Sequence, residues 1–574
     1  MKRDAAITEI SIEAALPRLL ILALVLVGLA MPATSGAATL EATFVTDINP
    51  GPSSSYFYDP VEYDGKLVFG AAGPTGYNPW SFDGRNAKRL ADMVVNYDTD
   101  GPREFTVFGG WVYYAADTQS TGGEIWRTNG TANELVSDIQ PGEGSSWPDD
   151  FKAFNGSLYF TAYTDATGEE LWKTDGSTTV SMGDLYPGVD GANIDEMTVL
   201  DGKLYFSART PASGNELFRT DGNTVTLASD IRPGASSSTP DDLTVMGSKI
   251  YMAANNGVNG DELYSTDGVS TSIAADIRPG GSSSAPDRLF EVGGKLYLGA
   301  TNGATGREPW VFDGTSASLI ADLNPGTNES RPRDFAAAGG QVFFNAITPA
   351  TGRELFSTQG AAVNLVADTY PGEESGNPGT PFSFQNSLYF RAEAPAVGRE
   401  LWVADASGGR LLKDILPGTD SSSPNNFVPF RGNLYFSADD GVHGSELWRL
   451  APRDRAVTVS VVGKRLKVDS KGRATIKLKC PATEANGPCT GSINLETSKA
   501  IKINGKRNRH KLGKAGFSIG AGVTKSLKFK FRKPVLKLLG TNPAARTFLA
   551  RIRVADRLGN QATVLKKLKA TVAK

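Results

Sequence analysis

Short runs of alternating apolar and polar residues, each closed by a turn signal, fill the chain from about residue 39 to residue 451. In the segment PDDFKAFNGSLYFTAYT, two such runs flank Asn155-Gly156, a dipeptide typical of tight hairpins. A third run, ELWKTDG, ends in an Asp-Gly turn, and a fourth stops at a Pro-Gly turn. Four strands of about five residues, without a helical period, predict a four-stranded antiparallel unit and an all-β fold.

The unit recurs every 46 residues, with no insertion or deletion between the aromatic residues that mark it. These aromatics are Trp80, Trp126, Trp172, Phe218, Tyr264, Trp310, Phe356, Trp402 and Trp448. The aspartate of a D-I/L-x-P-G turn keeps the same spacing at Asp138, Asp184, Asp230, Asp276, Asp322, Asp368 and Asp414. A repeat of this length predicts a β-propeller of nine blades in residues 39–451.

The two ends of the repeat region complement each other. The run from Leu40 to Ile48 resembles a fourth strand with no first three before it, whereas the last copy, Phe427 to Leu450, lacks a fourth strand. We therefore expect the N-terminal strand to complete the ninth blade and close the ring. Because propellers usually have about four to eight blades, an open superhelical array and two smaller rings stay as alternatives.

Residues 1–38 are typical of an export signal. Lys2 and Arg3 give a basic start, Leu19 to Met31 is apolar, and Ser35-Gly36-Ala37 offers small residues for cleavage. The apolar run is short for a membrane span, which needs about 20 residues. We expect cleavage and a secreted or surface-associated protein, with retention as an anchor as the alternative.

The charge changes sign near residue 453. Residues 453–574 carry 30 Lys and Arg against 5 acidic residues, whereas residues 39–452 carry 26 against 54. Runs such as RATIKLKC and SLKFKFR alternate at period two, so residues 456–574 predict a basic β-sandwich of immunoglobulin-like type, with a short helical turn at VLKLLG. Such asymmetry bears on binding partners rather than on the fold.

Cys480 and Cys489 are the only cysteines of the chain. In an exported protein an isolated pair predicts a disulfide. Two sulfurs with no histidine nearby disfavour a metal site, and the spacing excludes a C-x-x-C redox pair.

A glutamate stands two residues before most of the repeated aromatics, at Glu124, Glu170, Glu216, Glu262, Glu308, Glu354, Glu400 and Glu446. Residues two apart on a strand share a face. We therefore expect each glutamate to accept hydrogen bonds from a neighbouring blade and each aromatic to pack in the core. The functional alternatives are a cation-binding ring of carboxylates, broken by Asn78 in the first unit, and a carbohydrate-stacking platform.

Aspartates of the Asp-Gly turns, and those of the Pro-Gly turns, offer oxygen ligands that suit calcium, although turn aspartates more often bond their own backbone. The Asp-Gly set is Asp83, Asp175, Asp221, Asp267 and Asp313. The two histidines, His443 and His510, stand in no triad pattern, and no G-x-S-x-G, H-E-x-x-H or P-loop motif occurs. We expect no catalytic residue and no cofactor, with calcium as the alternative.

For the basic domain we expect an anionic partner: a cell-wall polymer, a lipid headgroup or a polysaccharide. Docking onto the acidic propeller and a merely solvated lysine-rich surface are the alternatives. Residues 453–574 contain no Trp and no Tyr, so they lack the stacking platforms that favour single-stranded nucleic acid.

The segments EELWKTDGST, NELFRTDGN and DELYSTDGV resemble the E-L-W-x-x-D-G-T repeat proteins, a family of exported bacterial propeller-like proteins. The likeness covers about residues 39 to 450. The C-terminal part, with KLKCP and VADRLGNQA, is similar to small β-domains that end many exported actinobacterial proteins. These resemblances imply export and an all-β fold, and they bring no catalytic residue.

Together these observations predict an exported, non-enzymatic binding or adhesion protein, with a protein or glycan ligand on the propeller. The alternatives are an extracellular carbohydrate-active enzyme with its site at the ring centre and a purely structural surface component.

Overall fold

The computed structural model describes residues 40–93, 101–360, 362–452, 458–481, 488–503, 506–555 and 561–572. The predicted export signal, 1–38, lies outside the described residues, as does the start of the basic segment at 453–457. Within the described ranges we find no helix with the length and apolar character of a membrane span.

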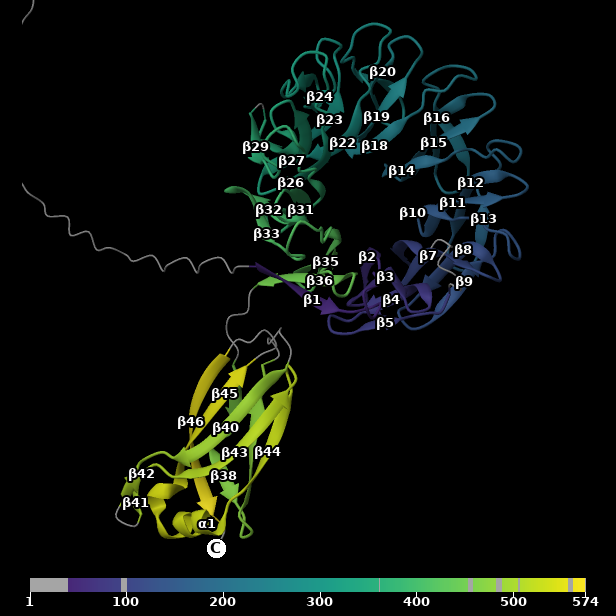
Figure 1. Cartoon of the computed structure of the whole chain (residues 1–574). Coiled ribbons are helices and arrows are strands. Elements are labelled where there is room, and N and C mark those ends of the chain that lie inside the picture. Colours follow the sequence, from purple (N-terminus) through teal and green to yellow (C-terminus); the bar gives the residue numbers. More distant parts are fainter. Residues whose placement is uncertain are drawn as a thin grey trace, which may run out of the picture. The chain divides into compact units, whose positions relative to one another are not determined.

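Nine four-stranded antiparallel sheets follow one another along the chain and form the blades of a propeller ring (Figure 1). Blades 1 to 8 each take four consecutive strands, from β2–β5 to β30–β33. Blade 9 has the order β1-β36-β35-β34, so its outer strand comes from the start of the described chain. The predicted nine-bladed propeller is confirmed.

The blade strands have the following bounds. The first strands are β2 (Tyr58–Tyr63), β6 (Arg103–Phe108), β10 (Asp149–Phe154), β14 (Asp195–Leu200), β18 (Asp241–Met246), β22 (Asp287–Val292), β26 (Arg333–Ala338), β30 (Gly379–Phe384) and β34 (Asn425–Phe430). The second strands are β3 (Lys66–Gly73), β7 (Trp111–Thr118), β11 (Ser157–Thr164), β15 (Lys203–Thr210), β19 (Lys249–Asn255), β23 (Lys295–Ala300), β27 (Gln341–Thr348), β31 (Ser387–Ala394) and β35 (Asn433–Asp439). The third strands are β4 (Gly76–Phe82), β8 (Gly122–Thr128), β12 (Gly168–Thr174), β16 (Gly214–Thr220), β20 (Asp261–Thr266), β24 (Glu308–Phe312), β28 (Gly352–Thr358), β32 (Gly398–Asp405) and β36 (Ser445–Pro452). The fourth strands are β5 (Ala87–Arg89), β9 (Asn133–Ser137), β13 (Thr179–Ser181), β17 (Val225–Ser229), β21 (Thr271–Ala275), β25 (Ala317–Leu319), β29 (Val363–Ala367), β33 (Gly408–Lys413) and β1 (Leu40–Thr46).

The ring is closed by β1. This strand pairs antiparallel with β36, so that Leu40 lies opposite Pro452 and Phe44 opposite Trp448. The first strands of neighbouring blades contact one another all round the ring, β34 with β2 included, and they form its inner layer (Figure 1). The pairing of the two ends rules out the open array and the two smaller rings.

Apolar cores lie between adjacent blades. Second strands such as β11 are buried along most of their length, on both faces of the sheet. Leu171 of blade 3, for example, packs in one cluster with Phe206 of blade 4. Because each blade is covered by its neighbours on both faces, the second strands contain continuous apolar runs such as LYF.

The basic domain is all-β, as predicted. Its main sheet consists of β37 (Ser460–Val462), β38 (Arg465–Val468), β39 (Arg473–Lys479), β40 (Cys489–Thr497), β43 (Lys511–Ile519), β44 (Thr524–Lys530), β45 (Thr547–Ala555) and β46 (Gln561–Val572). A hairpin of β41 (Ile501–Ile503) and β42 (Lys506–Asn508), the helix α1 (Lys533–Thr541) and the turn η1 (Pro543–Arg546) complete the described part. The parallel pair β38–β46 joins the layers expected of a sandwich into one curled sheet.

The predicted disulfide is confirmed. Cys480 and Cys489 are bonded to each other, and both are fully buried in the core of the basic domain. The predicted helical turn at VLKLLG lies in α1, which begins beside Pro534, a residue whose fixed φ suits the first turn of a helix.

Candidate functional sites

The repeated glutamates hold the linkers between blades. Glu124 in β8 is fully buried, and one of its carboxylate oxygens accepts hydrogen bonds from the backbone N–H of Ile139 (2.9 Å) and the hydroxyl of Ser146 (2.7 Å). The other oxygen accepts the N–H groups of Gln140 (3.2 Å) and Ser146 (3.1 Å). These donors lie on the linker from β9 to β10, so the carboxylate fixes the chain where it enters the next blade.

The same arrangement recurs with small changes around the ring. Serines donate in this way to Glu216, Glu262 and Glu400. At Glu170 the serine position is occupied by Ala192, and burial raises the pKa of this carboxyl to about 7. In blade 1 the amide oxygen of Asn78 accepts the N–H of Met93 (2.8 Å), so an uncharged side chain takes the same structural place.

The repeated aromatics pack against the preceding blade. Trp448 of blade 9 is 7% exposed and lies in one cluster with Tyr389 and Leu401 of blade 8. Trp80 of blade 1 packs in the same way on a cluster that contains Tyr435 of blade 9. Burial of such a side chain stabilises the fold by about 1.5–3 kcal/mol. Their place in the interior is that of core residues rather than of an open stacking platform.

The Asp-Gly turn aspartates bond their own backbone. Asp175 Oδ1 accepts the N–H groups of Ser177 (2.7 Å) and Thr178 (2.8 Å), and the bonds to Thr178 and Ser177 lower the pKa of Asp175. The same contacts are made by Asp83, Asp221, Asp267 and Asp313. These oxygens are therefore engaged in turn formation.

Both histidines are held in local contacts. His443 Nδ1 lies 2.8 Å from Asp440 Oδ2, and the ring stacks on Phe44 with centroids 4.6 Å apart. The bond to Asp440 raises the pKa of His443. His510 Nε2 lies 3.2 Å from the carbonyl oxygen of Ile501.

One position on the first strands was not predicted from the sequence. Every first strand has a register shift between its first and fourth residues, which marks a β-bulge. The second residue of each has a positive φ; these residues are Asp59, Glu104, Asp150, Glu196, Asp242, Arg288, Asp334, Thr380 and Asn426. Bulges re-aim side chains and recur next to functional sites. The signal was present in the sequence, because the two residues that open each first strand vary in charge between units: YD, RE, DD, DE, DD, DR, RD, GT and NN.

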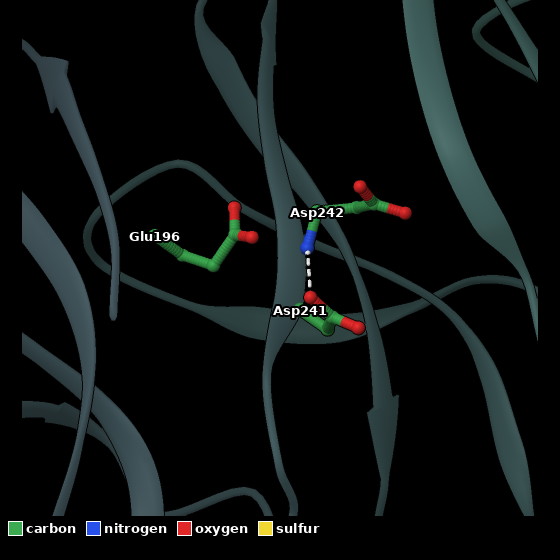
Figure 2. A group of neighbouring side chains, drawn as sticks. All are labelled: Glu196, Asp241 and Asp242. Atoms are coloured by element: carbon green, nitrogen blue, oxygen red, sulfur yellow. Dashed lines mark hydrogen bonds between the residues drawn. The ribbon is translucent and has the colours of Figure 1, made fainter. Parts of the chain in front are cut away.

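Blades 3 to 5 give the inner strands an acidic sector. Carboxylate oxygens of Glu196, Asp241 and Asp242 lie within 4.8 Å of one another, and Figure 2 shows the three side chains. Burial raises the pKa of Glu196 to about 7, and the charges of Asp241 and Asp242 act in the same direction. Three carboxylates at this spacing are hard oxygen donors that suit a divalent cation.

Two of these carboxylates also connect the inner strands. Glu196 accepts the backbone N–H of Leu243 (3.1 Å) from the next blade, and Asp242 accepts that of Arg288 from the blade after it. The acidic sector therefore has a structural role whether or not a cation is bound.

The basic domain carries a row of cations on the outer face of its sheet. Along β39, residues alternate between exposed and buried, so Arg473, Lys477 and Lys479 are exposed while Ala474, Ile476 and Leu478 enter the core. On β44, Lys528 and Lys530 are exposed, and Lys530 lies directly opposite Arg473. Like charges directly opposite each other destabilise a sheet.

A cavity of about 1110 Å³ lies in this basic surface. The residues that line it include the cations Arg465, Lys467, Arg473, Lys528 and Lys530 and one acid, Asp469. Its walls come from β38, β39, β44 and β46, where β38 and β39 pair through one residue pair only. The sheet therefore offers a concave, positively charged groove.

No protein-family model matches the sequence, and no curated protein matches it. Similar solved structures include one from a study of two prolyl endopeptidases (TM-score 0.33, 12% identity, 58% of this chain and 54% of that chain). Prolyl oligopeptidase B from Galerina marginata is another (TM-score 0.35, 10% identity, 75% and 56%). A third is the extracellular domain of the putative hybrid two component system BT4673 from B. thetaiotaomicron (TM-score 0.26, 10% identity, 92% and 77%). The chain spans little more than half the length of the two peptidase structures, and no activity, substrate or partner is transferred from any of the three.

Proposed function

We propose that the chain is an exported, non-enzymatic binding protein that its basic domain holds on an anionic polymer of the cell exterior. The observation that carries the proposal is the basic sheet face with its groove. Lys528, Lys530 and Arg473 are exposed side by side. Among the described residues that line the groove the one acid is Asp469, which pairs with Arg473 (2.7 Å) and leaves the lysines in excess. The buried disulfide fits an oxidising compartment, and the resemblance to E-L-W-x-x-D-G-T proteins also implies export.

The shape of the basic surface favours a polymer chain over a bilayer. The cations line a groove of about 1110 Å³, which an extended polyanion can enter and a flat membrane surface cannot follow. The absence of Trp and Tyr from residues 453–574 disfavours nucleic-acid stacking. We therefore assign the groove to a carboxylated or phosphorylated wall polymer or an acidic polysaccharide.

The test is retention of the full chain on an immobilised acidic polysaccharide, read as the salt concentration at elution. The double variant Lys528→Glu/Lys530→Glu is expected to elute at clearly lower salt than wild type. Lys249→Glu/Lys413→Glu, which makes the same change in net charge at exposed propeller lysines, serves as the matched control. Equal retention of the two variants would refute the proposed role. Stronger binding to anionic lipid vesicles than to the polymer would also contradict it.

One observation favours an enzyme as the second candidate. A general acid needs a raised pKa, and burial raises that of Glu196 to about 7. A carbohydrate-active enzyme with its site at the inner strands would lose hydrolysis of its polysaccharide in the variant Glu196→Gln. A panel of polysaccharides with reducing-end detection tests this candidate, and turnover by wild type would replace the non-enzymatic proposal.

A further inference from the structure

The inner part of blades 7 and 8 contains arginines that the proposed function does not use. Arg353 in β28 is only 6% exposed. Its Nη1 donates to the carbonyl oxygen of Arg331 (2.9 Å) and to Oδ1 of Asn345 (2.6 Å). Arg333 Nε donates to the same Oδ1 (3.2 Å). Two guanidinium groups therefore converge on one amide oxygen.

Arg391 of blade 8 lies beside the segment that Asn345 contacts. It lies opposite Gly379 in the β30–β31 pair, and its Nε is 3.6 Å from the point that a Cβ of Gly379 would occupy. The preceding residue, Pro378, accepts a hydrogen bond from Asn345 Nδ2 through its carbonyl (3.1 Å). Asn345 thus connects the two blades beside Arg391.

The positive charge of this group is poorly neutralised. In the part of the chain that the structure describes, no carboxylate oxygen lies within 4 Å of a nitrogen of Arg353 or Arg391. Asp334 contributes one carboxylate to the group: its Oδ2 accepts a hydrogen bond from Asn345 Nδ2 (2.6 Å) and lies 3.8 Å from Arg333 Nε. One carboxylate thus stands against three arginines. Burial and then the charge of Arg333 lower the pKa of Arg353 to about 10, and burial and Arg399 lower that of Arg391. A buried cation is costly unless an anion pairs with it.

Comparison with the preceding blade shows what has changed. Arg307 occupies the position of Arg353 one repeat earlier, and its Nη1 lies 2.5 Å from Oδ2 of Asp287. One repeat after Asp287 stands Arg333. In blade 6 the carboxylate of Asp287 neutralises Arg307. In blade 7 the position of Asp287 is taken by Arg333, which carries a guanidinium. At the next residue the exchange runs the other way, from Arg288 to Asp334, and Asp334 pairs with Arg333. Arg353 therefore lacks the direct carboxylate partner that Arg307 has in blade 6.

We propose that Arg333, Arg353 and Arg391 form a binding site for an oxyanion group, a carboxylate, phosphate or sulfate of a ligand that enters at the inner strands of blades 7 and 8. The planar fork of arginine matches such groups with two parallel hydrogen bonds. The bound oxyanion pairs with Arg353 as Asp287 pairs with Arg307 in blade 6. This site lies on the propeller and is independent of the basic sheet face.

The test is a titration of the full chain with sodium phosphate, sulfate or acetate, followed by thermal unfolding, with chloride at equal ionic strength as the reference. Wild type is expected to gain melting temperature with at least one oxyanion beyond the chloride effect. Arg391→Gln, at a partly exposed position, is expected to weaken the apparent affinity about tenfold or more, as loss of a charge-assisted hydrogen bond does. Arg353→Gln, where the variant folds, is also expected to weaken the apparent affinity for the oxyanion.

Arg307→Gln is the matched control, because it removes the same side chain at the equivalent position where Asp287 already pairs with it. The proposed function expects anions to bind the basic domain as well, so the decisive quantity is the difference between variants. Equal anion-induced shifts in wild type and Arg391→Gln would overturn the site, and so would an equal loss of the shift in Arg307→Gln. Phosphate and sulfate acting without acetate would identify a tetrahedral ligand group, and acetate alone a carboxylate.

Discussion

Glu446, in the third strand of blade 9 (β36), accepts a hydrogen bond of 2.7 Å from the backbone N–H of Ile48, which lies 398 residues away in sequence. The other carboxylate oxygen accepts the N–H of Asn49 (3.2 Å). Elsewhere in the ring the equivalent glutamates hold a linker that follows them in the chain. At this blade the same contact joins the two ends of the propeller, beside the β1–β36 pairing.

The variant Glu446→Ala is therefore expected to weaken the seam of the ring. It leaves two buried backbone N–H groups without acceptors, which costs about 1–3 kcal/mol for each group. Chemical unfolding should show this loss, and amide hydrogen exchange should rise in residues 40–46. The exposed Glu143→Gln is the control. Unchanged exchange at β1 would show that the carboxylate does not hold the seam.

A second prediction concerns the close approach of two backbones within the repeat. Gly260 has φ +75°, and a Cβ there would lie 2.6 Å from backbone atoms of Ser282 and Ser283. Gly247 has a similar φ, +63°, but a Cβ there meets nothing within 4 Å. Both alanine variants carry the left-handed backbone penalty of about 1–2 kcal/mol. Gly260→Ala should lose about 1–3 kcal/mol more, because the added methyl overpacks the site.

Urea unfolding of the two alanine variants measures this difference directly. Equal losses would mean that the linker at Ser282 moves aside without cost, and that the contact does not constrain the repeat.

Partly buried carboxylates on the first strands predict a pH dependence of stability. Burial is the largest cause that raises the pKa values of Asp150 and Asp287 to about 6 and that of Glu196 to about 7. Between the ordinary values, 3.8 for Asp and 4.5 for Glu, and these raised ones, the folded chain holds more protons than the unfolded chain. These groups therefore stabilise the fold less as pH rises through this window, and the propeller gains stability on acidification from pH 7 toward about 5.

The variant Glu196→Gln should flatten this dependence, since it removes one of the titrating groups. The measurement is the free energy of unfolding of wild type and variant at several pH values. Wild-type stability that rises between pH 5 and 7 would contradict the prediction. An equal slope in wild type and variant would show that Glu196 is not one of the groups responsible.

Reduction of the Cys480–Cys489 bond should destabilise the basic domain alone. A disulfide that closes a loop this short contributes about 2–3 kcal/mol in the chain-entropy model. We expect Cys480→Ser/Cys489→Ser to lower the calorimetric transition of the basic domain and to leave that of the propeller in place. A shift of both transitions would show that the two domains unfold together.

The order of the strands within a blade could be predicted from the sequence, because the four strands of a blade are consecutive in the chain. Hairpin dipeptides such as Asn155-Gly156 and the spacing of Glu170 and Trp172 act within one blade. Closure was readable for a related reason: Leu40 begins a run that lacks partners, and an unpaired edge has to be covered. The curled sheet of the basic domain was harder to predict, because the parallel pair β38–β46 connects strands from the two ends of that domain.

The sequence by itself determined the repeat, the number of blades, the closing strand and the core positions, since these depend on periodicity and on contacts inside one unit. Only the tertiary structure decided which charges meet. Glu196 and Asp242 stand one repeat apart, and Arg333, Arg353 and Arg391 come from three strands of two blades. They become neighbours because the ring brings equivalent positions of adjacent blades together, and because a bulge in each first strand re-aims the side chains there. Burial and Coulomb interaction between such groups depend on distances in space, which no one-dimensional pattern contains.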